Sequence, residues 1–344
     1  FQEKNILGKG EFAIVVRGKI ISESRLAAIK ISKPTVDVNF FKIFLSEIKI
    51  MLYIGKHKNV VSLIGVCTQD IKHRKLLHLF CFVKSTILQI CDLGSLERVL
   101  RSSRTNFVNL INANQELDSA LAPQNDAHLS TIDLISFSAQ IANGMAFLVE
   151  KSIVHADLAA RNVLLTSNKV AKISDFGFLN NLLQAPLPWR WMAIESLTTL
   201  AFSEQSDVWS YGVTLFEIFS LGDMPFPNES WNKQFLIRLQ SGMRMGRPLF
   251  STQEIYSKIT TCWEKDPALR PTFHNLKSYF GNALILLERE LISNDIGSNF
   301  ENSILRDIAM PVQPDPNTGN TELLQLYSNQ NTHQNLYVNT FSTN

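Results

Sequence analysis

Cysteines are few in this chain, and a long uninterrupted apolar run is absent. The four cysteines, Cys67, Cys81, Cys91 and Cys262, form no CxxC pair and no metal-binding spacing. We therefore expect a reduced cytosolic setting rather than a disulfide framework. No apolar run approaches the roughly 18 residues that a membrane-spanning helix needs. Because the sequence begins at Phe1 without a methionine, we expect a fragment, in which an upstream signal peptide or membrane span would not be visible.

An excess of one charge is also absent. The chain has 33 Lys and Arg against 31 Asp and Glu, for a net charge of +2. This balance excludes the strongly basic footprint of a nucleic-acid-binding protein, and no nucleic acid is expected as a partner. With 344 residues and 45% hydrophobic content, the chain is long enough to bury one or two substantial cores.

The most informative stretch is the run His-Ala-Asp-Leu-Ala-Ala-Arg-Asn at residues 155–162, which Asp-Phe-Gly follows at residues 175–177. Asp157 can accept a hydroxyl proton. Asn162 and Asp175 can hold the magnesium that neutralises a nucleotide's phosphates. The spacing of these three groups therefore predicts phosphoryl transfer.

The run at residues 155–162 resembles the catalytic loop of protein kinases, and specifically that of tyrosine kinases. Serine/threonine kinases usually carry a lysine two residues after the base, where this chain has Ala159. Arg161 precedes the asparagine, as in receptor-type tyrosine kinases. The resemblance covers about residues 1–285 and implies an α+β, bilobal protein-kinase fold. Its small antiparallel β lobe with one helix would span residues 1–91, and its larger, mainly helical lobe residues 92–285.

The periodicity of the sequence agrees with this division. Residues 1 to about 90 are strand-rich, with one amphipathic helix that carries Glu47 and has apolar residues at helical spacing. From about residue 130 the pattern is helical, and Ser130 with Asp133 forms a capping box. Residues 206–219 are apolar nearly all round, which predicts a buried helix. Two short strands, 162–165 and 170–173, should form a hairpin around a turn.

Three segments depart from the pattern. Residues 102–129 are rich in Asn, Ser, Ala and Gln and are interpreted as a surface insert, similar in place to the kinase insert of split-domain receptors. Residues 70–85 exceed the short hairpin that related kinases have beside the hinge, and the sequence offers no physical account of them. Residues 286–344 form a tail, whose Asn-, Gln-, Ser- and Thr-rich part from about residue 293 is predicted to be disordered.

A glycine-rich turn between residues 7 and 15 suggests a phosphate-binding loop, although an ordinary hairpin turn has the same pattern. The usual third glycine is Ala13 here. Lys30 follows at the distance of the kinase third strand, and the resemblance implies that it pairs with the α- and β-phosphates and is positioned by Glu47. The alternative is a solvated lysine at a strand end.

The resemblance also supplies the complete site. ATP and Mg²⁺ are the expected cofactors, with Mn²⁺ as an alternative metal. The catalytic residues would be Asp157, Arg161, Lys30 and Glu47, and the metal ligands Asn162 and Asp175. The nucleotide would be held by Leu7, Gly8, Gly10, Val15, Ala28, Lys30, the gatekeeper Leu88, the hinge residues Gln89 and Cys91, and Leu164.

Residues 187–196 resemble the platform on which tyrosine kinases dock a peptide. Trp189 is bulkier than the aliphatic residue usual there, and Ile194 replaces the usual proline. The resemblance implies that Glu195 pairs with Arg270, and that Asp207 hydrogen-bonds the catalytic-loop backbone. These acids would be structural rather than catalytic.

Two features of the usual activation switch are missing. Ala156 stands where most tyrosine kinases have an arginine, and residues 178–191 contain no tyrosine. In most tyrosine kinases that arginine binds a phosphotyrosine of the activation loop. We therefore predict that phosphorylation of this segment does not activate the protein.

The expected partners are protein substrates with tyrosine, and a second copy of the chain bound through an upstream region. The tail contains Tyr327 and Tyr337. The run Tyr-Val-Asn at residues 337–339 resembles a motif that adaptor SH2 domains bind once it is phosphorylated. In so asparagine-rich a tail, a chance match is the alternative.

Together these features predict a protein tyrosine kinase. We expect it to be the intracellular part of a single-pass receptor at the plasma membrane, and the alternative is a soluble cytoplasmic protein. A pseudokinase-like scaffold is the alternative function, which Ala156, Ala13, the short segment 178–191 and the extra residues at 70–85 favour. The retention of Lys30, Glu47 and the loop acids argues against it. A serine/threonine kinase is disfavoured by Ala159 and Arg161.

Overall fold

The computed structural model describes residues 6–9, 13–33, 38–68, 83–112, 114, 116, 128–182 and 186–289. All of them belong to one unit, Phe1–Asn294. Several features singled out from the sequence lie outside the described residues: Gly10, most of the 70–85 segment, much of the 102–129 insert, the tail from residue 290, and with it Tyr327 and Tyr337.

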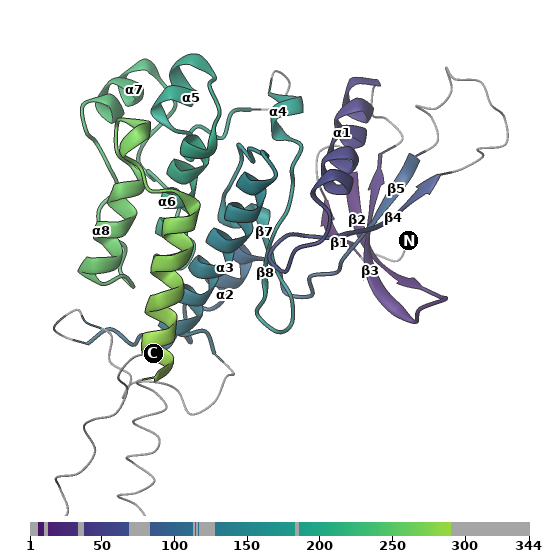
Figure 1. Cartoon of the computed structure of the whole chain (residues 1–344), viewed down its shortest axis with the longest axis horizontal. Helices are drawn as coiled ribbons and strands as arrows, with labels where there is room; N and C mark the ends of the chain where they lie inside the picture. Colours follow the sequence, from purple (N-terminus) through teal and green to yellow (C-terminus); the bar gives the residue numbers. More distant parts are fainter. Residues whose placement is uncertain are drawn as a thin grey trace, which may run out of the picture. The chain divides into compact units, whose positions relative to one another are not determined.

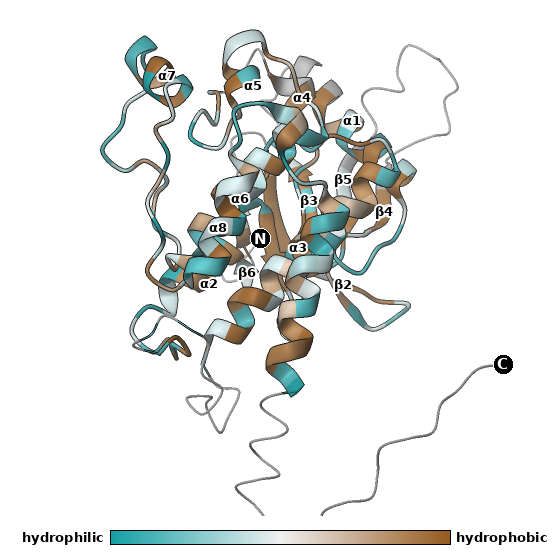
Figure 2. Cartoon of the chain, turned by 60° about the vertical axis from the view of Figure 1, so that its left-hand side comes forward, coloured by the Kyte–Doolittle hydropathy of each residue, from teal (hydrophilic) through white to brown (hydrophobic). Residues whose placement is uncertain are grey.

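The amino-terminal part is a five-stranded antiparallel sheet in the order β1-β2-β3-β5-β4. Ala27 and Ala28 in β3 are buried, and β3 pairs with β2 and β5 so that Lys30 lies opposite Val15 and Thr86. The strands are hydrophobic along much of their length, whereas the turn between β2 and β3 is hydrophilic (Figure 2). The strands are β1 (Ile6–Lys9), β2 (Ala13–Ile20), β3 (Arg25–Ser32), β4 (Leu63–Thr68) and β5 (Val83–Leu88).

Helix α1 (Val38–Ile54) lies beside this sheet (Figure 1). The apolar residues predicted at helical spacing include Phe44, Ile48 and Met51, and all three are buried, so Glu47 is carried on a helix anchored by its apolar face. The helix ends at Gly55, whose φ of +77° is a left-handed conformation suited to glycine.

The larger, carboxy-terminal part is mainly helical (Figure 1). Helix α6 has buried residues on nearly every face, as the sequence predicted, and the fully buried Trp209, Tyr211 and Phe219 belong to it. The elements are α2 (Leu96–Ser102), α3 (Thr131–Glu150), η4 (Ala160–Asn162), α4 (Phe178–Asn181), α5 (Ile194–Thr199), α6 (Glu204–Phe219), α7 (Lys233–Gln240), α8 (Gln253–Cys262), η5 (Pro267–Leu269) and a last helical segment, residues 273–289.

Helix α3 is long and apolar enough to cross a membrane by length and composition. Its most apolar window has a mean hydropathy of 1.4, and 56% of that window is buried inside the fold. Counting uninterrupted apolar runs misses this helix, because polar residues such as Gln140 and Asn143 interrupt it. Leu134, Phe137 and Ile141 are completely buried. We therefore interpret α3 as a core helix, and the predicted capping box of Ser130 and Asp133 starts it.

A second, three-stranded sheet consists of β6 (Gly94–Ser95), β7 (Val163–Leu165) and β8 (Ala171–Ile173), and an isolated bridge joins Ile173 of β8 to Val60, before β4. Strands β7 and β8 form the predicted antiparallel hairpin. Directly after β8, the Ser174 backbone N–H and hydroxyl both donate to the carbonyl oxygen of Asn162, at 2.9 Å each. This pairing fixes the catalytic loop against the segment that begins at Asp175.

Two segment boundaries that were drawn from the sequence lie elsewhere in the structure. Leu110 and Leu129 are buried, and Val108 pairs with Ser130 in an isolated β-bridge. Both ends of the predicted 102–129 surface insert therefore belong to the packed domain. The last helical segment continues past residue 285 to 289, with Leu287 buried. The composition of the sequence did not indicate the ends of these segments, because only a few apolar side chains anchor otherwise polar stretches.

Candidate active site

The ammonium group of Lys30 on β3 meets the carboxylate of Glu47 on α1. The Nζ atom donates to Oε1 at 2.8 Å and to Oε2 at 2.7 Å, and it lies 3.4 Å from Oδ1 of Asp175. Burial alone would lower the pKa of Lys30, but the two carboxylates outweigh it and raise the pKa above its ordinary value. Lys30 is therefore always positively charged. It is paired with carboxylates, unlike the solvated strand-end lysine that was the alternative interpretation.

The side chain of Asp157 is held by its own loop. Asn162 Nδ2 donates to Oδ2 at 2.8 Å and to the Asp157 carbonyl oxygen at 2.7 Å, and the Arg161 guanidinium pairs with Oδ1. Burial raises the pKa of Asp157, although the Arg161 charge opposes the shift. A carboxylate with a raised pKa is a better acceptor for a proton.

Two buried acids of α6 hold the backbone of this loop. Asp207 accepts from the backbone N–H groups of His155 at 2.7 Å and Ala156 at 2.8 Å, as predicted, and Glu217 accepts from that of Ala160 at 2.9 Å. Burial raises the pKa of Asp207 to about 6 and that of Glu217 to about 7. Ala156 has a left-handed φ of +65°, which costs an L-residue about 1–2 kcal/mol. The Asp207 clamp offsets this strain.

Between the sheet and the helical part lies a pocket of about 340 Å³. Of the residues predicted to hold a nucleotide, all but Gly10, which is not described, line it: Leu7, Gly8, Val15, Ala28, Lys30, Leu88, Gln89, Cys91 and Leu164. Glu47 and Asp175 line it as well. Another hollow, of about 510 Å³, shares only Gln89 with this set and brings together none of the catalytic groups.

The pocket also contains residues that the sequence reasoning missed. Arg98 on the first turn of α2 lines it together with Ser95, whose hydroxyl accepts the Arg98 backbone N–H as the helix N-cap. No signal in the sequence indicated Arg98, because only the folded path of the hinge brings α2 to the pocket. Arg98 adds a second positive charge to the pocket, in which Lys30 is already paired with Glu47 and Asp175.

The acids of the site fit a hard divalent cation. The amide nitrogen of Asn162 is occupied by Asp157, so its oxygen faces away as the available ligand atom. The side chain of Asp175 is 55% exposed. The Lys30 charge and the hydrogen bond from the Ser174 hydroxyl keep the pKa of Asp175 below its ordinary value, and the group is ionised at neutral pH. Among the described residues no group of three His, Cys, Asp or Glu could hold a metal ion.

A family model described as protein tyrosine and serine/threonine kinase matches residues 1–280. The chain belongs to this family. The kinase is 36% identical over 325 residues to vascular endothelial growth factor receptor 1 of Mus musculus, a match that covers 81% of this chain and 24% of the receptor. It is 35% identical to receptor 3 of Danio rerio (81% and 23%) and 33% identical to receptor 2 of Coturnix japonica (81% and 24%).

The chain spans about a quarter of the length of the curated relatives it matches. The fold class and the resemblance to a receptor tyrosine kinase catalytic domain, both predicted from the sequence, are confirmed. Members of the family use ATP and a divalent metal in general.

The segment that the sequence predicts to dock a peptide is built on aromatic residues. Trp189 packs against Phe235, with ring centroids 4.8 Å apart, and against Trp231 at 6.0 Å. The Arg190 guanidinium lies 4.1 Å from the Trp189 ring and donates to the carbonyl oxygens of Pro225, Phe226 and Glu229. The bulk of Trp189 is therefore accommodated by a matching aromatic cluster.

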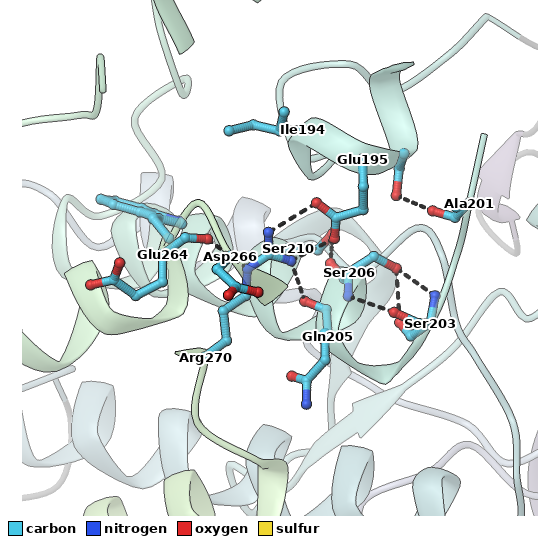
Figure 3. Close-up of polar contacts among 12 residues, drawn as sticks. Ile194, Glu195, Ala201, Ser203, Gln205, Ser206, Ser210, Glu264, Asp266 and Arg270 are labelled. Atoms are coloured by element: carbon cyan, nitrogen blue, oxygen red, sulfur yellow. Dashed lines mark hydrogen bonds and ion pairs between the residues drawn. The ribbon is translucent and has the colours of Figure 1, made fainter. Parts of the chain in front are cut away.

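The predicted pair of Glu195 and Arg270 is present (Figure 3). Arg270 donates to both carboxylate oxygens, at 2.6 and 2.9 Å, and its side chain is completely buried. The bidentate geometry fixes the start of α5 to the loop after η5. Ile194, at the first position of α5, is buried and leaves the pair intact.

Proposed function

We propose that this chain is the catalytic domain of a receptor tyrosine kinase that transfers the γ-phosphoryl group of ATP to the hydroxyl of protein tyrosines. One observation carries the proposal: Lys30 of β3, Glu47 of α1 and Asp175 after β8 line one pocket, and the catalytic loop is hydrogen-bonded to the segment that carries Asp175. Lys30 contacts both Glu47 and Asp175 there, and the hydrogen bonds of Ser174 to the Asn162 carbonyl oxygen hold the loop with Asp157 and Asn162 beside Asp175.

Each group has a role that follows from its charge and partners. Lys30, held by Glu47, binds phosphate oxygens of the nucleotide. Asn162 and Asp175 hold the divalent metal, which neutralises phosphate charge when bound. Asp157 orients the tyrosine hydroxyl and accepts its proton, and Arg161 steadies that carboxylate. Leu7, Val15, Ala28 and Leu164 enclose the adenine, with the hinge residues Gln89 and Cys91 at its edge.

Tyrosine is favoured over serine or threonine as the acceptor. Ala159 and Arg161 are of the tyrosine-kinase type, and the relatives are receptors by name. A scaffold without catalysis is the weaker alternative, because a chain freed from phosphoryl transfer has no chemical reason to keep Asp157, Asn162 and Asp175 together. By analogy with the relatives, we further propose an intracellular position in a membrane receptor that dimerises, and SH2 docking at Tyr337 after phosphorylation.

The direct test is a kinase assay with ATP and Mg²⁺ or Mn²⁺ on matched peptides that differ only in having tyrosine, serine or threonine as the acceptor. We expect phosphate on tyrosine alone, because the substrate platform leaves a short hydroxyl too far from Asp157. A folded sample that binds ATP and phosphorylates no tyrosine peptide would contradict the proposal. Transfer mainly to serine would reassign the acceptor.

The missing switch leads to a second prediction. Ala156 has no charge to bind a phosphate, and residues 178–191 offer no tyrosine, so phosphatase treatment should change kcat on a peptide by less than about twofold. Activity before and after treatment is compared, with mass spectrometry of the segment as the control. An activating phosphate found at stoichiometric level between residues 177 and 195 would refute the prediction.

A further inference from the structure

Glu217 on α6 joins the catalytic loop to the substrate platform. Its side chain is buried, and a single carboxylate oxygen, Oε2, accepts two hydrogen bonds. One comes from the backbone N–H of Ala160 and one from the indole Nε1–H of Trp191, each at 2.9 Å. These donors are 57 and 26 residues away along the chain, so one acid connects three separate segments.

The contact continues from Trp191 to the site itself. The guanidinium carbon of Arg161 lies 4.3 Å from the centre of the Trp191 ring, a cation–π geometry. The same guanidinium pairs with Oδ1 of Asp157. Trp191 therefore supports, with its ring face, the cation that orients the proposed base. Its backbone is fixed separately, because Ser210 donates to the Trp191 carbonyl oxygen at 2.8 Å.

We infer that Glu217 is a positioning residue for phosphoryl transfer: it fixes the Trp191 indole as the surface that holds Arg161, and through Arg161 it sets the direction of the Asp157 carboxylate. The inference rests on the proposed function and assigns Glu217 a task that Asp207 does not have. Asp207 clamps only backbone N–H groups at the other end of the loop.

The cost of burying the charge of Glu217 distinguishes a positioning role from a purely structural one. An ionised carboxylate in so dry a position is costly, and burial raises the pKa of Glu217 to about 7 even with two hydrogen bonds and the nearby Arg161 charge. Glu97 on α2 is the other charged group that acts on it and raises the pKa further. An amide oxygen could accept the same two N–H groups without the cost of the charge. Glutamine at this position should therefore hold the fold at least as well as glutamate.

The test compares Trp191→Phe with Trp263→Phe. The first removes the N–H donor to Glu217 and keeps a ring beneath Arg161. The second is a matched control, because the Trp263 indole N–H is buried and has no hydrogen-bond partner among the described residues. We expect Trp191→Phe to lower kcat on a tyrosine peptide by about tenfold or more with KM for ATP unchanged, since small misplacements of catalytic groups have effects of this size. Trp263→Phe should leave kcat unchanged.

Glu217→Gln supplies the conservative variant. We expect it to retain much more activity than Glu217→Ala, and the double variant Trp191→Phe/Glu217→Ala to be no slower than the slower single variant, because both substitutions interrupt the same path. A Trp191→Phe protein with unchanged kcat and a lowered melting temperature would overturn the inference and leave Glu217 a purely structural role.

Failure of the proposed function is a separate outcome. If the wild-type protein phosphorylates no tyrosine peptide, the inference is judged by NMR on the Nε–H resonance of Arg161, assigned by its loss in Arg161→Lys. We expect a single ordered resonance in the wild type and Trp263→Phe, and a broadened or shifted one in Trp191→Phe and Glu217→Ala. An Arg161 resonance that is the same in all four proteins would overturn it.

Discussion

Asp157→Asn is expected to lower kcat on a tyrosine peptide by about 10³-fold, within the range that general acid–base catalysis contributes. Asparagine has the same shape and retains an oxygen for the hydrogen bond from Asn162, but it cannot accept the substrate's proton. The substitution removes a buried charge whose pKa is already raised, so the fold should be unharmed. Steady-state kinetics with ATP and a peptide measures the loss.

The matched control is Asp223→Asn. Asp223 also pairs with an arginine, Arg104, at 2.6 Å, but its side chain is 59% exposed and contacts none of the site residues. We expect wild-type kcat for this variant. ATP affinity and melting temperature of Asp157→Asn should stay close to those of the wild type, and residual activity above about a tenth of wild type would mean that Asp157 is not the base.

Glu195→Ala is expected to reduce the free energy of unfolding by about 3–5 kcal/mol, the cost of breaking a buried ion pair from one side. The side chain of Arg270 is 0% exposed, and the substitution would leave it without its counter-ion. Its remaining hydrogen bonds go to the carbonyl oxygens of Gln205 and Glu264, at 2.8 and 2.9 Å (Figure 3). Carbonyl dipoles compensate a full charge only in part. Urea denaturation measures the change.

Two further variants make this result specific. Replacing both partners, as Glu195→Ala/Arg270→Met, removes the orphaned charge and should recover a large part of the loss. Arg104→Ala breaks the exposed pair with Asp223 and should cost at most about 1 kcal/mol. A Glu195→Ala protein destabilised no more than Arg104→Ala would show that water reaches Arg270 and that the pair contributes little.

Helices and strands of this kinase that depend on the local pattern of apolar residues were predictable from its sequence. The helix that carries Glu47 has apolar residues at helical spacing, helix α6 is apolar nearly all round, and two short apolar runs form the hairpin after Asn162. The structure has all three where these patterns predict. The pair of Glu195 and Arg270 is 75 residues apart in the chain. It was predicted only because the resemblance to kinases connects the two motifs.

The contacts of Glu217 and Arg98 were out of reach of that reasoning. Glu217 lies within an apolar helix, where a single acid gives no indication of what it faces, and its partners are set by how α6 packs against η4. Arg98 is one of several charged residues on a short helix, and only the three-dimensional path of the hinge brings it to the pocket. The buried ends of the 102–129 insert were missed for a related reason, since one leucine in a polar stretch carries no periodic signal.

The clamp of Asp207 on Ala156 also bears on how such a domain can be controlled. The left-handed backbone at that residue is held by a carboxylate from α6 and not by any group on its own side chain. Restoring an arginine there would add a charge with no phosphate to receive it. We therefore expect the catalytic loop to take its conformation from folding alone, without a phosphate bound at Ala156.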